Sequence, residues 1–292
     1  KYNLGLKEGL WVDYYPTDTI EFISEYHNDT LNGTVVAFYP NGNTDFEGEY
    51  NYGVMDGPYT EYYFNGNLFI NAFYSYGREI GYWESFYANN KMQSKGYYVD
   101  GIKDSTWSYF YYGGIQKQVE EYRLGELFNV SKSVDFKGGL HSSGSFKDGF
   151  GTRVYYDSIA RKVAEIPYVN GLKEGVGYSF NAKSGNVTAS SLYSDGFLDG
   201  ETKGFFGSGK LSAQINYEFG KEQGRYLEFF ENGDTLTIGC YKDGLEDDLW
   251  FDFCENGQLL SEGYYLYGEL DGEWFEYFDT GEIASESSYL FG

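Results

Sequence analysis

Aromatic and apolar residues recur along the chain in runs of five or six, separated by short polar segments rich in Gly, Asn and Asp. Within residues 47–68, a run that contains three tyrosines lies between Asp56-Gly57 and Asn65-Gly66. Aromatic side chains favour the pleated surface of a strand, whereas Gly and Asn tolerate the positive φ of tight turns. The pattern therefore predicts β-hairpins connected alternately by a Gly-x-x-Asp-Gly loop and an Asn-Gly turn.

The hairpin pattern has a fixed period. Copies of a Tyr-x-x-Gly motif follow one another every 24 residues, and the spacing departs from 24 only between Phe146 and Tyr193. Thirteen such positions bound twelve repeats, so residues 1–292 are expected to form a single array rather than two globular domains. The positions are Tyr2, Tyr26, Tyr50, Tyr74, Tyr98, Tyr122, Phe146, Tyr168, Tyr193, Tyr217, Tyr241, Tyr265 and Tyr289.

The repeat also predicts how the hairpins assemble. An isolated hairpin is marginal in water, so successive hairpins must pair edge to edge. We expect an all-β fold of about twelve 24-residue hairpins, stacked into one elongated, twisted antiparallel sheet. Degenerate copies are expected at about 127–190, where the motif weakens.

The unit Glu-Gly-x-Tyr-x-x-Gly-x-x-Asp-Gly-x-Trp-x-x-Tyr-Tyr-x-Asn-Gly-x-Leu resembles the MORN repeat. It is most similar to the bacterial MORN repeat variant of proteins often named YwqK-family antitoxins. The resemblance implies a ribbon of stacked hairpins that binds other proteins or organises assemblies near membranes. The antitoxin name implies neutralisation of a toxin by binding rather than by catalysis.

Strand alternation predicts an aromatic face for the array. A Trp or Tyr opens the second strand of many repeats, and the residue four positions later points to the same side. A large exposed aromatic face usually marks an interaction site, so we expect a partner protein there. Two alternatives remain: these rows only stack on their neighbours and hold the ribbon together, or they bind a glycan. The candidate residues are Trp11, Tyr15, Tyr39, Tyr59, Tyr63, Trp83, Tyr87, Trp107, Tyr111, Trp250 and Trp274.

The charge distribution narrows the classes of partner. The chain has 45 Asp and Glu residues against 21 Lys and Arg, a formal net charge of −24. Such a charge repels phosphate backbones and anionic lipids, which argues against nucleic acid and acidic membranes as partners. Lys and Arg are absent between Glu8 and Gly77 and again from Asp243 onwards, so the charge is concentrated towards the two ends.

The sequence contains few residues that could support catalysis or bind a metal or cofactor. The chain has two histidines and no known motif of a nucleophile, phosphate loop or zinc site, so we expect no catalytic residue, metal or cofactor. An enzyme remains an alternative only if a cleft forms around His141, within the irregular stretch 129–167. Cys240 and Cys254 are expected to be free thiols, with Cys254 facing a residue near Thr237.

Compartment is indicated by short sequence triplets. Five Asp-Ser/Thr triplets, among them Asp29-Thr30-Leu31 and Asp234-Thr235-Leu236, resemble an O-glycosylation sequence of exported bacterial proteins. The alternative is that Asp closes a turn and a β-branched residue begins the next strand. We expect an exported, cell-envelope or cell-surface protein, with a cytoplasmic location as the alternative.

Overall fold

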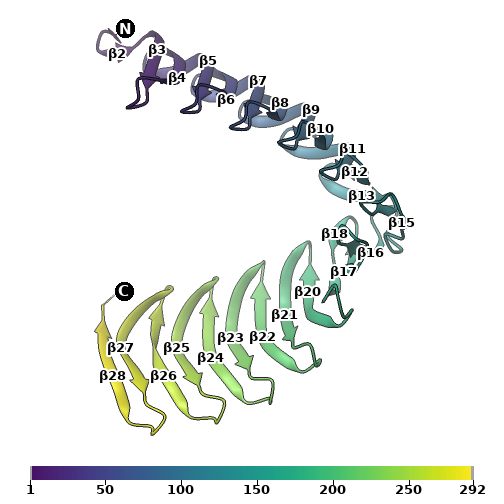
Figure 1. The fold of residues 1–292 in the computed structure, drawn as a ribbon. Helices are drawn as coiled ribbons and strands as arrows, with labels where there is room; N and C mark the ends of the chain where they lie inside the picture. The colour runs from purple at the N-terminus through teal and green to yellow at the C-terminus, as the bar shows by residue number, and fades with distance from the viewer. Residues whose placement is uncertain (1, 291–292) are drawn as a thin grey trace. The chain divides into compact units, whose positions relative to one another are not determined.

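The computed structural model describes residues 2–290, which form strands and turns throughout (Figure 1). They belong to two compact units. Unit 1 runs to Ser143 and includes Lys147–Gly149, and unit 2 contains Gly144–Phe146 and continues from Phe150. No helix in the described part of the chain has the length and apolar character needed to span a membrane.

Unit 1 is built on an 11-stranded antiparallel sheet in which β3 to β13 follow one another in chain order. Small two-stranded sheets, β1 with β2 and β14 with β15, complete the unit. The strands are β1 (Tyr2–Asn3), β2 (Leu6–Lys7), β3 (Gly9–Tyr14), β4 (Ile20–His27), β5 (Thr30–Phe38), β6 (Thr44–Asn51), β7 (Val54–Tyr62), β8 (Leu68–Ser75), β9 (Arg78–Phe86), β10 (Met92–Val99), β11 (Ile102–Phe110), β12 (Gln116–Arg123), β13 (Glu126–Val130), β14 (Ser133–Val134) and β15 (Leu140–His141).

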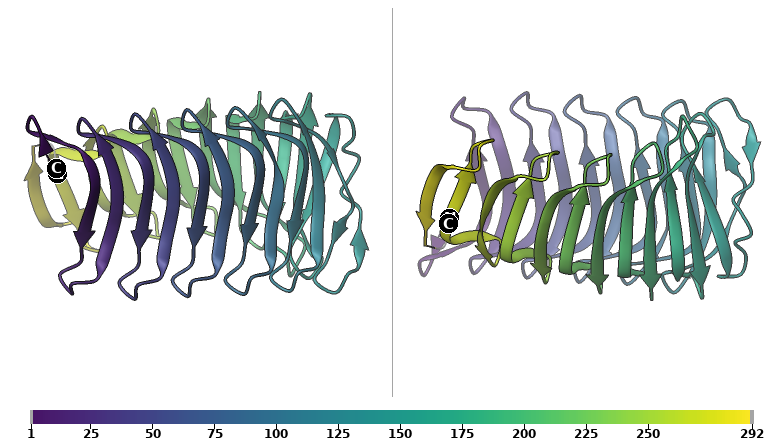
Figure 2. Two further views of the ribbon diagram at one scale, coloured as in Figure 1. Left: turned by 90° about the horizontal axis from the view of Figure 1, so that it is seen from above. Right: turned by 90° about the horizontal axis from the view of Figure 1, so that it is seen from below.

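Unit 2 is built on a 13-stranded sheet that also follows chain order, with β18 paired to β17 beside the main path. Figure 2 shows the successive hairpins of each unit displaced along its sheet. The strands are β16 (Gly151–Tyr156), β17 (Lys162–Val169), β18 (Leu172–Lys173), β19 (Gly175–Phe180), β20 (Val187–Ser194), β21 (Phe197–Phe205), β22 (Leu211–Glu218), β23 (Lys221–Phe229), β24 (Thr235–Lys242), β25 (Leu245–Phe253), β26 (Leu259–Leu266), β27 (Glu269–Tyr277) and β28 (Ile283–Tyr289).

The all-β hairpin-repeat fold expected from the sequence is confirmed, and the structure shows where its regularity changes. The strands form two long sheets instead of the one continuous sheet expected, because the stretch between β13 and β16 contains only the short strands β14 and β15. That stretch lies within the segment expected to hold degenerate repeats.

The Tyr-x-x-Gly motif marks one of the two connections in each repeat. Between β6 and β7, Asn51 pairs with Val54, and the intervening Tyr52 and Gly53 have φ of 49° and 81°. Two positive φ values in a two-residue connection define the type I′ turn, whose twist matches that of the strands. Gly tolerates this conformation without the steric cost of a Cβ, which explains its recurrence.

The predicted Gly-x-x-Asp-Gly loop is only partly correct: its first glycine, Gly53, lies in the turn, but strand β7 runs straight through Asp56 and Gly57. Gly48 pairs with Tyr59 and Tyr50 pairs with Met55, so Glu49 faces three residues of β7. Gly57, at φ 140°, belongs to this β-bulge. Positive φ suits a bulge as well as a turn, and the sequence alone does not distinguish the two.

The predicted Asn-Gly turn is present as the second connection. After β7, the N–H of Gly66 donates to the carbonyl oxygen of Tyr63 at 2.7 Å, and the N–H of Tyr63 donates to Asn67 at 2.8 Å. Gly66 has φ 82°. This is the three-residue hairpin connection in which a type I turn precedes a left-handed residue.

Buried side chains of the unit 1 sheet gather on one face. Trp107 is 2% exposed, and Ala72, which pairs with Tyr59, is 1% exposed. Alternation and register place Ser24, Val35, Ala37 and Ser85 on the same side. We call this side, in both units, the tryptophan face, and the other side the opposite face.

Candidate interaction surface

The predicted Trp and Tyr positions at the start of the second strand form aromatic rows on the tryptophan face. In unit 1, Tyr98 meets Trp83 at 5.5 Å and Trp107 at 4.9 Å between ring centroids, both edge to face. In unit 2, Tyr265 meets Trp250 and Trp274, each at 5.9 Å. Edge-to-face contact is a favourable arrangement of aromatic rings, so each Tyr of the motif links two repeats.

Glycine leaves the space that these rings occupy. A Cβ built on Gly96 would lie 2.1 Å from the ring of Trp107, and one on Gly239 would lie 2.3 Å from Trp250. Gly263 has the same relation to Trp274, at 2.0 Å. Gly is thus required at this position of the repeat because the next Trp lies against its backbone.

The second predicted row consists of tyrosines that are hydrogen-bonded between repeats. The hydroxyl of Tyr15 donates to the carbonyl oxygen of Phe38 at 2.8 Å, and Tyr39 donates to Tyr62 at 2.7 Å. Tyr63 and Tyr87 repeat the contact with Phe86 and Phe110, at 2.9 and 2.8 Å. Tyr111 occupies the next position, with the Lys117 ammonium 5.7 Å from its ring centroid.

The environment of this row favours the neutral phenol. Burial, followed by a hydrogen-bonding interaction with the Asp45 carboxylate as acceptor, raises the pKa of Tyr39 to about 12. Burial also raises the pKa of Tyr63 and Tyr87 above the ordinary value. These hydroxyls therefore remain donors to the neighbouring repeat throughout the physiological pH range.

Polar groups at both ends of the hairpins add further links that the sequence reasoning missed. At the Tyr-x-x-Gly turns, the N–H of Gly53 donates to Leu31 at 2.7 Å and that of Gly77 donates to Met55 at 2.8 Å. At the Asn-Gly turns, the Asn65 side chain donates to the carbonyl oxygen of Ala88 at 3.1 Å. The recurrence of Asn at this position was visible in the sequence, but its acceptor depends on how the hairpins stack.

All eleven predicted residues therefore lie on the tryptophan face. Each either makes one of these contacts between repeats or occupies the equivalent position of another repeat. Nine belong to unit 1, and the remaining two, Trp250 and Trp274, belong to unit 2. Trp11 and Tyr59 extend the aromatic row through Tyr26 and Tyr74. Their arrangement matches the alternative in which the aromatic rows hold the ribbon together.

The opposite face carries exposed apolar side chains that the sequence analysis did not single out. In unit 1, Leu10 is 65% exposed, and Tyr14 and Phe73 are also exposed. In unit 2, Val176 and Leu249 are exposed on the corresponding side. Strand alternation could have separated these positions from the tryptophan rows, but only the packing shows which side remains open.

Carboxylates lie among these apolar residues in the first repeats. Glu25 pairs with Leu10 across the strands, and Glu49 pairs with Thr34. The two carboxylates help to line a hollow of about 450 Å³ together with Asp56. Because Lys and Arg are absent between Glu8 and Gly77, this part of the opposite face is both acidic and apolar.

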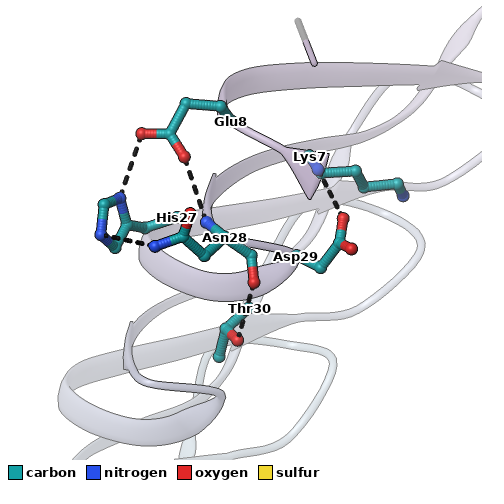
Figure 3. A network of polar contacts seen from close by, with 6 residues as sticks. All are labelled: Lys7, Glu8, His27, Asn28, Asp29 and Thr30. Carbon is teal, nitrogen blue, oxygen red and sulfur yellow. Dashed lines mark hydrogen bonds and ion pairs between the residues drawn. The ribbon is translucent and has the colours of Figure 1, made fainter. Parts of the chain in front are cut away.

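A polar network ties the first strands of unit 1 together (Figure 3). The Glu8 carboxylate accepts from the Asn28 N–H at 3.1 Å and lies 3.0 Å from Nδ1 of His27. The Asn28 N–H, and then His27, lower the pKa of Glu8. Asn28 and Asp29 form the turn between β4 and β5, so the network fixes that turn against Glu8, the residue between β2 and β3.

His141 serves a turn in the irregular stretch. Its Nε2 lies 3.0 Å from Oδ2 of Asp135, and Asp135 also accepts from the N–H groups of Lys137 and Gly139. His141 and these N–H groups lower the pKa of Asp135 to about 2. The pair closes the connection between β14 and β15.

The cysteines and acidic residues were the other candidates for chemistry. Cys240 and Cys254 are free, and Cys240 pairs with Asp247 across β24 and β25. Thr237 faces Asp252 rather than Cys254, because the turn centres on Asp243 and Gly244 and a bulge between Ile238 and Cys240 then shifts the register. Within residues 2–290, no group of three or more His, Cys, Asp or Glu side chains is arranged to hold a metal ion.

Comparison with known families identifies individual repeats. Residues 31–52, 55–76, 79–100, 198–218 and 270–290 match the family described as the MORN repeat variant. No curated protein matches the chain significantly.

Two crystal structures share a weak likeness with the chain. They are TcdB2-TccC3 without the hypervariable C-terminal region, at 10% identity and a TM-score of 0.15, and TcdB2-TccC3-Cdc42, at 9% and 0.14. Each match covers 92% of this chain. The chain spans only 18% and 19% of the length of those two chains.

Proposed function

The chain is a MORN-variant repeat protein, and we propose that it is a non-enzymatic scaffold that binds a partner protein through its opposite face. The proposal follows from how the two faces use their aromatic and apolar side chains. On the tryptophan face, rings and hydroxyls are engaged with neighbouring repeats. On the opposite face, apolar side chains of the same sheets remain exposed.

The proposal rests on the exposed apolar side chains of the opposite face. Leu10, Tyr14 and Phe73 in unit 1 and Val176 and Leu249 in unit 2 make no contribution to a buried core on their side of the sheet. Contiguous apolar surface on a folded protein marks an interaction site more often than scattered residues do. The rigid repeat presents such residues at regular intervals, which suits an extended interface.

The acidic residues on the opposite face of unit 1 indicate what kind of partner would bind there. Glu25 and Glu49 lie among the apolar residues of a segment without Lys or Arg. A partner that places Lys or Arg around an apolar patch would complement this surface and associate faster at low salt. A toxin would be one such partner, and its neutralisation would then require only that the ribbon cover its functional surface.

Affinity capture with matched variants tests the proposal. The full chain is immobilised and exposed to extract of its own source cells, beside a Leu10→Ser/Tyr14→Ser variant and a Tyr52→Ser control in an exposed turn. We expect a basic protein to be recovered by the wild type and the control, to be lost with the double variant, and to be eluted by salt.

Two outcomes would contradict the proposal. In the first, the double variant recovers the same protein in the same amount, which would place the interface elsewhere. In the second, no protein is recovered specifically by the wild type. Circular dichroism of each variant checks that the strands are retained.

A further inference from the structure

A hollow of about 520 Å³ lies across β9, β10 and β11 in unit 1. Six side chains that line it supply its chemistry: Tyr82, Glu84, Lys95, Tyr97, Thr106 and Ser108. Its volume is within the range of small-molecule sites, which combine apolar rings with a few polar groups. The hollow belongs to the opposite face, away from the contacts that join the repeats.

Two tyrosines form its aromatic part. Tyr82 pairs with Tyr97 across β9 and β10, and their rings meet at 5.3 Å with an interplanar angle of 89°. Tyr82 is nevertheless 77% exposed. A ring that is held in a T-shaped contact and is still largely exposed can accept a flat ligand without rearrangement of the sheet.

Polar side chains surround the ring pair. Lys95 pairs with Glu84 on one side and with Ser108 on the other. The ammonium and carboxylate offer donors and acceptors beside each other, and the hydroxyls of Thr106 and Ser108 offer both. Charged groups make stronger hydrogen bonds to neutral hydroxyls than neutral groups do.

This combination occurs once among the equivalent pairs of unit 1. The repeat supplies an internal comparison, because the cross-strand position of Tyr82 and Tyr97 recurs in each hairpin. None of the other pairs contains a tyrosine, so the pair of tyrosine rings is not a consequence of the fold. They are Leu10 with Glu25, Thr34 with Glu49, Pro58 with Phe73, and Thr106 with Glu121.

The ligand class follows from what the hollow can and cannot hold. A single Lys beside a Glu does not neutralise a phosphate, and the net charge of −24 repels anions. A peptide strand cannot add to the sheet there, because β9, β10 and β11 are paired on both sides. A pyranose presents C–H groups to an aromatic face and hydroxyls at its rim, which matches an open ring bordered by polar groups.

We propose that this hollow is a binding site for neutral oligosaccharides, in which Tyr82 stacks on a sugar ring and Glu84 and Lys95 bind its hydroxyls. The site differs from the Trp and Tyr rows considered from the sequence, whose rings are engaged within the ribbon. It does not depend on the scaffold role, because it takes another ligand at one defined place on the opposite face.

The test measures binding of the full chain to defined sugars. Cellohexaose, maltohexaose, mannohexaose and chitohexaose are titrated by calorimetry, with hexagalacturonate as an anionic comparison. We expect at least one neutral hexasaccharide to bind, and Tyr82→Ala to weaken it about tenfold or more. Tyr52→Ala, which removes a comparably exposed ring in a turn, leaves the affinity unchanged.

Further variants separate stacking from hydrogen bonding. Glu84→Gln and Lys95→Met are each expected to weaken the same sugar while retaining the unfolding midpoint of the wild type. Failure of all four neutral sugars to bind would overturn the proposal. So would equal affinity of Tyr82→Ala and the wild type, or preferential binding of hexagalacturonate. None of these results would affect the partner-protein capture, which uses other residues.

Discussion

The hydroxyl of Tyr39 donates a 2.7 Å hydrogen bond to the carbonyl oxygen of Tyr62, which lies 23 residues later at the matching corner of the next hairpin. Tyr15, Tyr63 and Tyr87 repeat this relationship in unit 1. In unit 2 the same corner is occupied by residues without a phenolic hydroxyl. Among them are Phe206, Phe230, Cys254 and Phe278.

Removal of one hydroxyl tests what this link contributes. We expect Tyr39→Phe to lower the free energy of unfolding by about 1 kcal/mol, because a partly buried acceptor loses its donor while the ring is kept. Urea unfolding followed by tryptophan fluorescence measures the change. Tyr52→Phe, in an exposed turn, is the control and is expected to have no effect. Equal effects of the two substitutions would show that the Tyr39 bond contributes nothing.

Addition of the missing hydroxyl tests the same link in reverse. The register shift between Asp252 and Phe253 is equivalent to the one between Glu61 and Tyr62. The carbonyl oxygen of Phe253 therefore occupies the place of the Tyr62 acceptor. We expect Phe230→Tyr to raise the free energy of unfolding by about 0.5–1 kcal/mol. The same urea unfolding measures it, with Phe219→Tyr at an exposed turn as the control. A destabilised Phe230→Tyr variant would contradict the equivalence of the two corners.

A methyl group at Gly96 tests the packing of tryptophan on glycine. Because the added Cβ would lie 2.1 Å from the Trp107 ring, we expect Gly96→Ala to destabilise the chain by about 3 kcal/mol. In a Trp107→Val background the same change should cost much less, which a double-mutant cycle of thermal unfolding measures. Gly113→Ala, where no atom lies within 4 Å of the new Cβ, is the control. Additive effects of the two substitutions would show that the ring and the glycine do not interact.

Alkaline pH tests the buried phenols. Burial raises the pKa of Tyr39 and of Tyr74 from 10.0 to about 12, so the folded chain holds these protons more tightly than the unfolded chain does. Their contribution to stability is therefore complete below pH 10 and is lost as the pH rises to about 12. Thermal unfolding midpoints across this interval should fall, and fall less steeply in Tyr39→Phe than in Tyr52→Phe. Parallel curves for the two variants would contradict the assigned pKa of Tyr39.

The sequence predicted the repeat well because local turn chemistry repeats with it. The turn predicted at Asn65-Gly66 is present, and Gly53 of the predicted Gly-x-x-Asp-Gly loop lies in a turn. Gly57 shows the limit of such reasoning. Its positive φ belongs to a bulge that is defined by Glu49 on the neighbouring strand, and no local pattern contains that information.

The predicted interaction residues show a second limit. Alternation placed Trp83 and Tyr87 on one face, but it could not show whether that face is open. The answer depends on contacts between repeats, such as Tyr98 against Trp83 and the Tyr87 hydroxyl on Phe110. The sequence did contain a signal of this structural role. Tyr87 and Phe230 occupy equivalent positions of their repeats, and the absence of the hydroxyl from Phe230 suggests that it has a structural role in only one part of the chain.

We propose that the opposite face, and not the tryptophan face, contacts the partner protein. Hydroxyl-radical footprinting of the chain alone and with the captured partner measures the protection of individual side chains. We expect protection at Leu10, Tyr14 and Phe73 with unchanged labelling at Trp11 and Trp83. Protection at Trp11 and Trp83, with Leu10, Tyr14 and Phe73 labelled as in the free chain, would contradict it.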